Sequence, residues 1–272
     1  MRSMVNSQSP IGVFDSGLGG LSVLKELALA MPGENFIYLG DIARLPYGTK
    51  SQSVVSKYSL SCANFLVQQG VKAVVVACNT ASALALTQLQ KTLKVPVMGV
   101  IEPGVKAALH LSKGNNENQI LVLATEGTVK SEAYLKEFRF QGFQERVEQL
   151  PCPLLVPLAE EGWFDHPITQ EVIETYLSPL GKTHQGIFLL GCTHYPLLEK
   201  SFKQVLGEKA LITHGAEVLS QELRDLLASK ELLNKSKQSR TLTFYSTDQI
   251  RTSLPILNAL FDREISFSVV DL

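Results

Sequence analysis

Two stretches of sequence decide the fold: VVVACNTASALAL at residues 74–86 and IFLLGCTHYPLLE at residues 187–199. Each begins with a short apolar run, continues with a cysteine and two polar residues, and ends in a helical pattern. Strand, polar loop and helix in that order predict a βαβ unit, whose parallel strand is buried on both faces. The same unit therefore occurs twice, with Cys78 and Cys192 114 residues apart.

A second pair of loops repeats at nearly the same spacing. IGVFDSGLGG at residues 11–20 and ILVLATEGTV at residues 120–129 both place an apolar run before a hydroxyl residue, a glycine and a helical pattern. Gly17 and Gly127 are 110 residues apart. The two matching spacings favour two similar lobes, although chance similarity between α/β units would give the same pattern.

The rest of the chain alternates short apolar runs with helical patterns, which predicts an α/β fold. The expected strands are 11–14, 35–39, 73–77, 97–101, 120–124, 186–190, 210–213 and 242–245. The expected helices are 21–30, 51–69, 82–94, 130–138, 168–180, 196–206 and 218–230.

The composition excludes several classes of protein. With 272 residues, 45% of them hydrophobic and 19% charged, the chain can form a substantial core and is not globally disordered. Its 25 Lys and Arg residues nearly balance 26 Asp and Glu residues, so we expect no nucleic-acid partner. No apolar run has the length of a membrane span, and no signal peptide is visible. We expect a cytoplasmic protein with no membrane partner.

Cys78 and Cys192 are the strongest candidates for chemistry. Each follows an expected strand and precedes an expected helix, whose free N–H groups and partial positive charge favour a thiolate. We expect this setting to lower the thiol pKa from about 8.5, with Asn79 and Thr80 as helix caps. His194 is near enough to hold or transfer the proton of Cys192. A buried structural cysteine is the alternative for both.

The other cysteines fit structural positions. Cys62 lies inside an expected helix without a polar cluster, and Cys152 lies between prolines. None of the four cysteines forms a C-x-x-C pair, and the histidines lack metal-ligand spacing, so we expect no metal.

Two further features each allow two interpretations, and a third has a single one. Asp15 heads the DSGLGG loop, where it would cap a helix or orient a charged group or a thiol. The loop RLPYGTKS at residues 44–51 fits a simple turn or a contact to a small polar ligand. Glu160 and Glu161 fit a solvated pair.

Ligands bind α/β sheets at the carboxyl ends of the parallel strands. If the two lobes face each other, one cleft would receive side chains from both. Those expected there are Asp15, Ser16 and Cys78 from one lobe and Thr125, Cys192, Thr193 and His194 from the other.

Six motifs together resemble those of bacterial glutamate racemases. They are IGVFDSGLGGLSVL (11–24), YLGDIARLPYGTKS (38–51), VVVACNTASALAL (74–86), VPVMGVIEPG (95–104), CPLLVPLAEEG (152–162) and LLGCTHYPLL (189–198). The resemblance implies a cofactor-independent enzyme that interconverts L- and D-glutamate and supplies D-glutamate for peptidoglycan, and hence for cell-wall biogenesis and cell shape. Members of that family commonly dimerise, so a homodimer is consistent with the resemblance, although no interface is visible in the sequence.

The resemblance also implies two pseudo-symmetric lobes, each a mostly parallel sheet flanked by helices, with the active site in the cleft between them. Residues 1–101 and 213–272 would form the lobe that carries Cys78, and residues 102–212 the lobe that carries Cys192. The C-terminal segment would thus complete the first lobe.

By the same resemblance, Cys78 and Cys192 are the two acid/base residues, Cys78 acting on D-glutamate and Cys192 on L-glutamate. Because one must be a thiolate while the other is a thiol, a bell-shaped pH profile is expected. The positions that match assisting groups are Asp15, His194 and Glu160. The positions that match substrate contacts are Asp15, Ser16, Pro46, Tyr47, Gly48, Asn79, Thr80, Thr125, Thr193 and His194.

Four positions depart from the family pattern: Ile42, Glu126, Thr213 and His214. Two other functions stay open. One is a related racemase that acts on aspartate or a hydantoin. The other is a two-lobed protein that binds an amino acid without chemistry.

Overall fold

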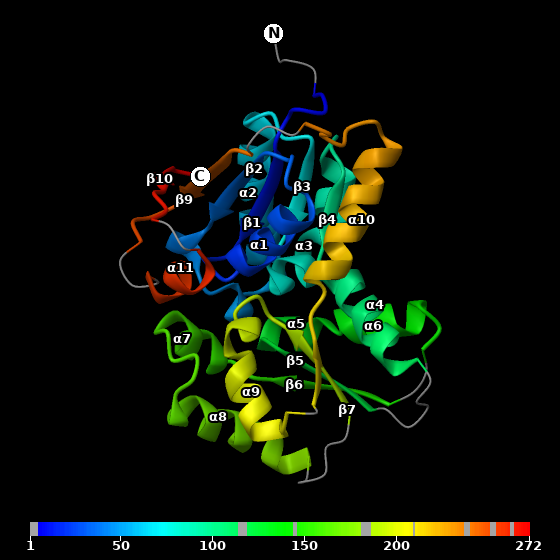
Figure 1. Ribbon diagram of the computed structural model, residues 1–272, viewed down its shortest axis with the longest axis vertical. Helices are drawn as coiled ribbons and strands as arrows, with labels where there is room; N and C mark the ends of the chain where they lie inside the picture. Colours follow the sequence, from blue (N-terminus) through cyan, green and yellow to red (C-terminus); the bar gives the residue numbers. More distant parts are fainter. Residues whose placement is uncertain are drawn as a thin grey trace.

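The protein is an α/β fold built on two parallel sheets flanked by helices, as the sequence predicts. The computed structural model describes residues 5–113, 119–143, 146–180, 186–208, 210–236, 240–250, 254–261 and 264–272. A six-stranded sheet has the order β10-β9-β2-β1-β3-β4, and a four-stranded sheet has the order β6-β5-β7-β8. In Figure 1 the six-stranded sheet and its helices occupy the upper part of the molecule and the four-stranded sheet the lower part.

The strands of the six-stranded sheet come from both ends of the chain. They are β1 (Ile11–Asp15), β2 (Phe36–Gly40), β3 (Ala73–Val76), β4 (Val97–Gly99), β9 (Leu242–Ser246) and β10 (Ser268–Val269). The four-stranded sheet contains β5 (Gln119–Ala124), β6 (Val147–Pro151), β7 (Gly186–Gly191) and β8 (Leu211–Thr213). Strand β1 pairs in parallel with both β2 and β3, and β5 with both β6 and β7. The ends of β1 and β3, and those of β5 and β7, therefore meet at one edge of their sheets.

Helices cover both faces of each sheet, which is why the central strands are buried throughout. The six-stranded sheet packs with α1 (Leu21–Ala30), α2 (Gln52–Gln68), α3 (Asn79–Thr92), α10 (Ala216–Ser229) and α11 (Leu254–Leu260). The four-stranded sheet packs with α4 (Ile101–Ser112), α5 (Glu126–Ser131), α6 (Ala133–Phe140), α7 (Leu155–Glu160), α8 (Pro167–Leu177) and α9 (Glu199–Leu206). The 3-10 helices are η1 (Ile42–Arg44), η2 (Tyr47–Thr49), η3 (Ser178–Leu180) and η4 (Tyr195–Leu198).

The structure differs from the sequence prediction at several element ends, and it contains helices α4, α7 and α11 and strands β6 and β10, which were not predicted. Strand β6 was not predicted because VEQLP at an edge position is half-buried and has no apolar run. Helix α4 begins at Ile101, where a strand was expected to end, because Pro103 is tolerated in a first helical turn. The expected helix 130–138 is two helices, since Glu132 adopts a left-handed conformation (φ 56°) between α5 and α6.

In the described part of the chain, no helix combines the length and the apolar character needed to cross a lipid bilayer.

Candidate active site

Cys78 and Cys192 line the same cavity, which has a volume of about 100 Å³. Cys78 follows β3 of the six-stranded sheet, and Cys192 follows β7 of the four-stranded sheet. Of the residues that sequence reasoning assigned to the site, those lining this cavity are Ser16, Pro46, Tyr47, Gly48, Cys78, Asn79, Thr80, Thr125, Glu160, Cys192, Thr193 and His194. Asp15 does not line the cavity and lies behind it.

Cys78 is itself the N-cap of α3. Its sulfur accepts a hydrogen bond from the backbone N–H of Ala81 at 3.4 Å, so the helix begins three residues earlier than predicted. Asn79 and Thr80 are the first helical residues and not the caps. The thiol also donates to the Ser16 hydroxyl at 3.6 Å.

The expected lowering of the Cys78 pKa is wrong for this structure. Burial raises the pKa to about 12, and the nearby charge of Asp15 adds to the rise, although the Ala81 amide and Ser16 lower it. Desolvation of the thiolate thus outweighs the helix N-terminus. The structure around Cys78 therefore favours the neutral thiol over the thiolate.

Asp15 ends β1 and is completely buried. Its carboxylate accepts hydrogen bonds from the Gly17 N–H at 2.9 Å and the Thr193 hydroxyl at 3.4 Å. Burial raises its pKa, an effect that the nearby His194 opposes. Asp15 does not cap α1, whose N-cap is Gly20; a Cβ at Gly20 would lie 2.5 Å from the Asp15 Cβ. Asp15 therefore joins the two strand-end loops that meet behind the cavity.

Cys192 has a different proton partner. Its sulfur lies 3.8 Å from His194 Nδ1, and His194 Nε2 lies 3.3 Å from Glu160 Oε1 as an ion-pair contact. Burial lowers the pKa of His194, but the hydrogen bonds to Cys192 and Glu160 outweigh this and raise the pKa to about 10. Cys192 does not sit directly before an α-helix, because η4 comes first. The imidazole, rather than a helix, is the group placed to exchange a proton with this sulfur.

Hydroxyl and amide groups connect the two halves of the cavity. Asn79 Nδ2 donates to the Tyr134 hydroxyl at 2.8 Å, and the Thr80 and Thr125 hydroxyls lie 2.8 Å apart. Thr125 also caps α5 by accepting the N–H of Thr128 at 3.5 Å. These contacts hold the starts of α3 and α5 against each other, where both face the cavity.

Several lining residues were not identified from the sequence. They are Gly17, Leu45, Thr49, Pro153, Val156 and Pro157. Each lies inside a motif that the sequence analysis quotes, but none was singled out, because all except Thr49 are glycine or apolar residues without a reactive group. Glu126, singled out as a departure, also lines the cavity.

The two remaining cysteines are both buried. Cys152 belongs to the core below Cys192, consistent with its expected structural position. The expectation for Cys62 is wrong in one respect, because a polar group does lie beside it: its sulfur is 3.9 Å from the Tyr47 hydroxyl.

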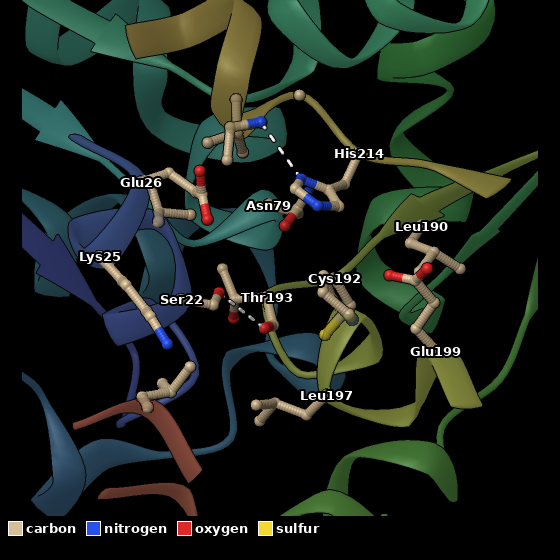
Figure 2. A pocket seen from close by; sticks show the side chains of 16 residues that line it. Ser22, Lys25, Glu26, Asn79, Leu190, Cys192, Thr193, Leu197, Glu199 and His214 are labelled. Carbon is tan, nitrogen blue, oxygen red and sulfur yellow. Dashed lines mark hydrogen bonds between the residues drawn. The ribbon is translucent and has the colours of Figure 1, made fainter. Parts of the chain in front are cut away.

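A second cavity of about 220 Å³ shares Cys192 with the first. Figure 2 shows this second cavity, with Cys192 among the side chains that line it. Asn79 and Thr193 are also shared. The departure at His214 lies in this second cavity, where its Nδ1 accepts the Ala216 N–H at 3.4 Å at the start of α10. Within the described residues, no group of three or more His, Cys, Asp or Glu side chains is arranged to hold a metal ion.

Known proteins with similar sequences indicate the family. The family model of Asp/Glu/hydantoin racemases matches residues 11–222. The chain belongs to this family. Within the racemase family it is 44% identical to the glutamate racemase of Geobacter metallireducens over 238 residues, which are 88% of this chain and 87% of the relative. It is 45% identical to that of Aquifex pyrophilus, covering 88% of each chain.

Solved structures of the family share the fold. A glutamate racemase of Bacillus anthracis superposes with a TM-score of 0.90 at 37% identity, covering 98% of this chain and 99% of that one. A glutamate racemase of Francisella tularensis in complex with D-glutamate superposes with a TM-score of 0.87 at 36% identity, covering 97% and 98%.

Proposed function

We propose that this protein is a cofactor-independent glutamate racemase that interconverts L- and D-glutamate through two cysteines. The observation that carries the proposal is the single cavity with one sulfur from each sheet in its wall. Inversion at Cα needs a base that removes the proton from one face and an acid that delivers a proton to the other. Two thiols on different elements around one small cavity meet this requirement.

The proton steps follow from the partners of the two sulfurs. With L-glutamate, the Cys192 thiolate takes the Cα proton while the Cys78 thiol gives its proton to the opposite face. The products are D-glutamate, a Cys192 thiol and a Cys78 thiolate. The Cys192 thiol then releases its proton to solvent, a step that the adjacent imidazolium of His194 favours, and solvent restores the proton of Cys78. With D-glutamate, the same steps run in reverse.

Negative charge that develops at Cα spreads into the α-carboxylate, which must be stabilised by hydrogen-bond donors. Asn79 and Thr80 line the cavity with an amide and a hydroxyl at the start of α3, where the first N–H groups of a helix have no acceptor within the helix. Thr125 and Thr193 offer hydroxyl groups from the other side. The chain thus has its own donors for both carboxylates of glutamate.

The relatives favour glutamate over the alternative substrates. The Francisella protein binds D-glutamate, and an Escherichia coli glutamate racemase that is 26% identical binds L-glutamate. An aspartate racemase of Picrophilus torridus is only 16% identical, with a TM-score of 0.54, and supports the fold alone. A binding protein without chemistry would not require paired cysteines in one cavity.

We further propose that residues 1–101 and 213–272 form one lobe and residues 102–212 the other. The pairing of β9 with β2, and of β10 with β9, supports the assignment of the C-terminal segment to the first lobe. The physiological role that we propose is supply of D-glutamate for peptidoglycan. The cytoplasmic location and the homodimer stay predictions.

The test is incubation of the purified protein with L-glutamate in D₂O, without pyridoxal phosphate or added metal. We expect D-glutamate that carries deuterium at Cα, detected by chiral chromatography with mass spectrometry. L-aspartate and a hydantoin serve as parallel substrates. Tight glutamate binding without deuterium uptake, or faster turnover of aspartate or the hydantoin, would contradict the proposal.

A further inference from the structure

The loop at residues 44–49 forms one wall of the active cavity and touches the other half of the site. Leu45, Pro46, Tyr47, Gly48 and Thr49 all line the cavity. A Cβ at Gly48 would lie 2.8 Å from the Thr125 Cβ, and one at Gly127 would lie 2.9 Å from the Gly48 carbonyl oxygen. The loop therefore packs directly against the start of α5. A small shift of this loop would change the space that a substrate can occupy.

A single buried carboxylate holds this loop from behind. Asp41 is completely buried and does not line the cavity. Its Oδ1 accepts hydrogen bonds from Arg44 Nε and from the Thr247 hydroxyl, both at 2.9 Å, and its Oδ2 accepts one from the Tyr47 hydroxyl. Since a buried carboxylate is stable only when its oxygens are satisfied, the three donors and the carboxylate fix one another.

The ring of Tyr47 is fixed on its other sides as well. The Arg44 guanidinium lies 4.8 Å above the ring of Tyr58, and the rings of Tyr47 and Tyr58 are 6.0 Å apart. Burial raises the pKa of Tyr47 well above its usual value, and the nearby Cys62 and Asp41 add to the rise. The phenol thus keeps the proton that it donates to Asp41.

The third donor brings in the C-terminal part of the chain. Thr247 directly follows β9 and is 206 residues from Asp41 in sequence. Its N–H donates to the Gly40 carbonyl at 3.1 Å, and its hydroxyl also accepts the Ala43 N–H at 3.0 Å. The Asp41 N–H donates to the carbonyl of Asp15 at 3.0 Å. Asp41 is therefore tied to β1, to β9 and to the cavity loop at once.

We propose that Asp41 is a positioning residue for the reaction, whose buried carboxylate holds the 44–49 loop through Tyr47 and Arg44 in the arrangement that fits the substrate. Thr247 orients that carboxylate. The inference rests on the proposed function, because it assigns the loop to the substrate site of that reaction. Since Asp41 is not among the partners of the Cys78 or Cys192 sulfurs, its loss should weaken substrate binding more than it slows proton transfer.

The kinetic test compares Asp41→Asn, Thr247→Val and the matched control Thr243→Val, which makes the same change elsewhere on β9. We expect KM for glutamate to rise about 10-fold in Asp41→Asn and about 3-fold in Thr247→Val. The first increase corresponds to the loss of one charged hydrogen bond and the second to its weakening. We expect kcat to stay within about 2-fold and its pH profile to keep its shape. In the double variant Asp41→Asn with Thr247→Val, KM should be close to that of Asp41→Asn alone, because Thr247 acts through Asp41.

A second readout needs no activity. Lys50 lies at the end of the loop, so the rate of tryptic cleavage after Lys50, followed by mass spectrometry, reports whether the loop is held. We expect faster cleavage there in Asp41→Asn and Thr247→Val than in the wild type and Thr243→Val, with cleavage after Lys91 on α3 unchanged.

The two readouts separate the possible failures. If the wild type does not racemise glutamate, the proposed function fails. The proteolysis still tests whether Asp41 and Thr247 hold the 44–49 loop. If the wild type is active but both variants keep the wild-type KM, or lose kcat as much as kcat/KM, the positioning role is wrong. Unchanged cleavage after Lys50 in Thr247→Val would also overturn it, even if Asp41→Asn does not fold.

Discussion

Cys78 and Cys192 occupy equivalent places in two different sheets, yet their surroundings differ. Both follow the end of a buried parallel strand and line one cavity. The Cys78 sulfur is held by a helix N–H and a serine hydroxyl, with the buried Asp15 nearby. The Cys192 sulfur faces an imidazole that is itself backed by the carboxylate of Glu160.

This difference shows that repetition of a backbone unit does not repeat its acid–base chemistry. At Cys78, burial favours the neutral thiol. At Cys192, the raised pKa of His194 favours an imidazolium beside the sulfur. Under the proposed two-base mechanism, the two sulfurs must start a turnover in different protonation states, and their different partners provide for that difference.

The largest expected effect comes from removal of either sulfur. Cys78→Ala and Cys192→Ala should each lower kcat/KM for racemisation by at least about 10³-fold, since each removes an obligatory acid or base. In D₂O, Cys78→Ala should still exchange the Cα proton of L-glutamate, because Cys192 is intact, and Cys192→Ala should exchange that of D-glutamate.

NMR of the unreacted enantiomer measures this exchange. Exchange of the opposite enantiomer in each variant would reverse the assignment of faces. Near-normal racemisation by either variant would contradict the two-base mechanism.

The groups that support each sulfur should have a smaller effect. Asp15→Asn and His194→Asn should each lower kcat/KM by about 10²-fold, within the usual range for an assisting acid or base. Because L- and D-glutamate are equally stable, kcat/KM must fall equally in both directions, so the asymmetry appears in isotope effects. His194→Asn should enlarge the primary isotope effect with 2-deutero-L-glutamate, and Asp15→Asn that with 2-deutero-D-glutamate. Equal isotope effects with both enantiomers in both variants would show that the two supports are not specific to their sulfurs.

His194 should also make the stability of the protein depend on pH. Its pKa in the folded protein is raised to about 10, above about 6.5 for an unfolded histidine. The stabilisation is therefore complete below about pH 6.5 and declines as the pH rises through the folded pKa, by up to about 1.4 kcal/mol per pH unit. We expect the free energy of unfolding, measured with urea, to fall between pH 6.5 and 8.5 in the wild type and to vary less in His194→Asn. The exposed His110, changed to Asn, is the control and should keep the wild-type slope.

The comparison also shows what could be predicted from the sequence. The apolar runs before Cys78 and Cys192 predicted the strands, because a strand buried on both faces must be apolar throughout. Strand β6 was not predictable in this way, since its edge position leaves polar residues such as Glu148 and Gln149 half-buried. Most site residues could be identified because each carries a functional group in a motif.

Two properties of the site depend on three-dimensional packing. The pKa of Cys78 depends on how completely the surrounding chain excludes water, which no local sequence pattern shows. The contact of Asp41 with Thr247 joins residues 206 positions apart, and nothing in either segment indicates the other. Local order thus predicted most of the strands and the main chemical groups, while burial and long-range contacts decided how those groups behave.

The smallest expected effect comes from substitution of Cys152. This substitution tests whether a cysteine must line the cavity to act in the reaction, or whether it is enough to lie in the same core as Cys192. Cys152 is buried in the same core as Cys192, and burial, together with the charge of Cys192, raises its pKa to about 12. Its sulfur donates to the Leu150 carbonyl at 3.6 Å and does not line the cavity. Cys152→Ala should lower the free energy of unfolding by about 1 kcal/mol through the small void that it leaves, and change kcat/KM by less than about 2-fold. If Cys152→Ala instead lost racemisation as completely as Cys192→Ala, the sulfur that acts from the four-stranded sheet would have to be reassigned, because access to the cavity is what distinguishes the two.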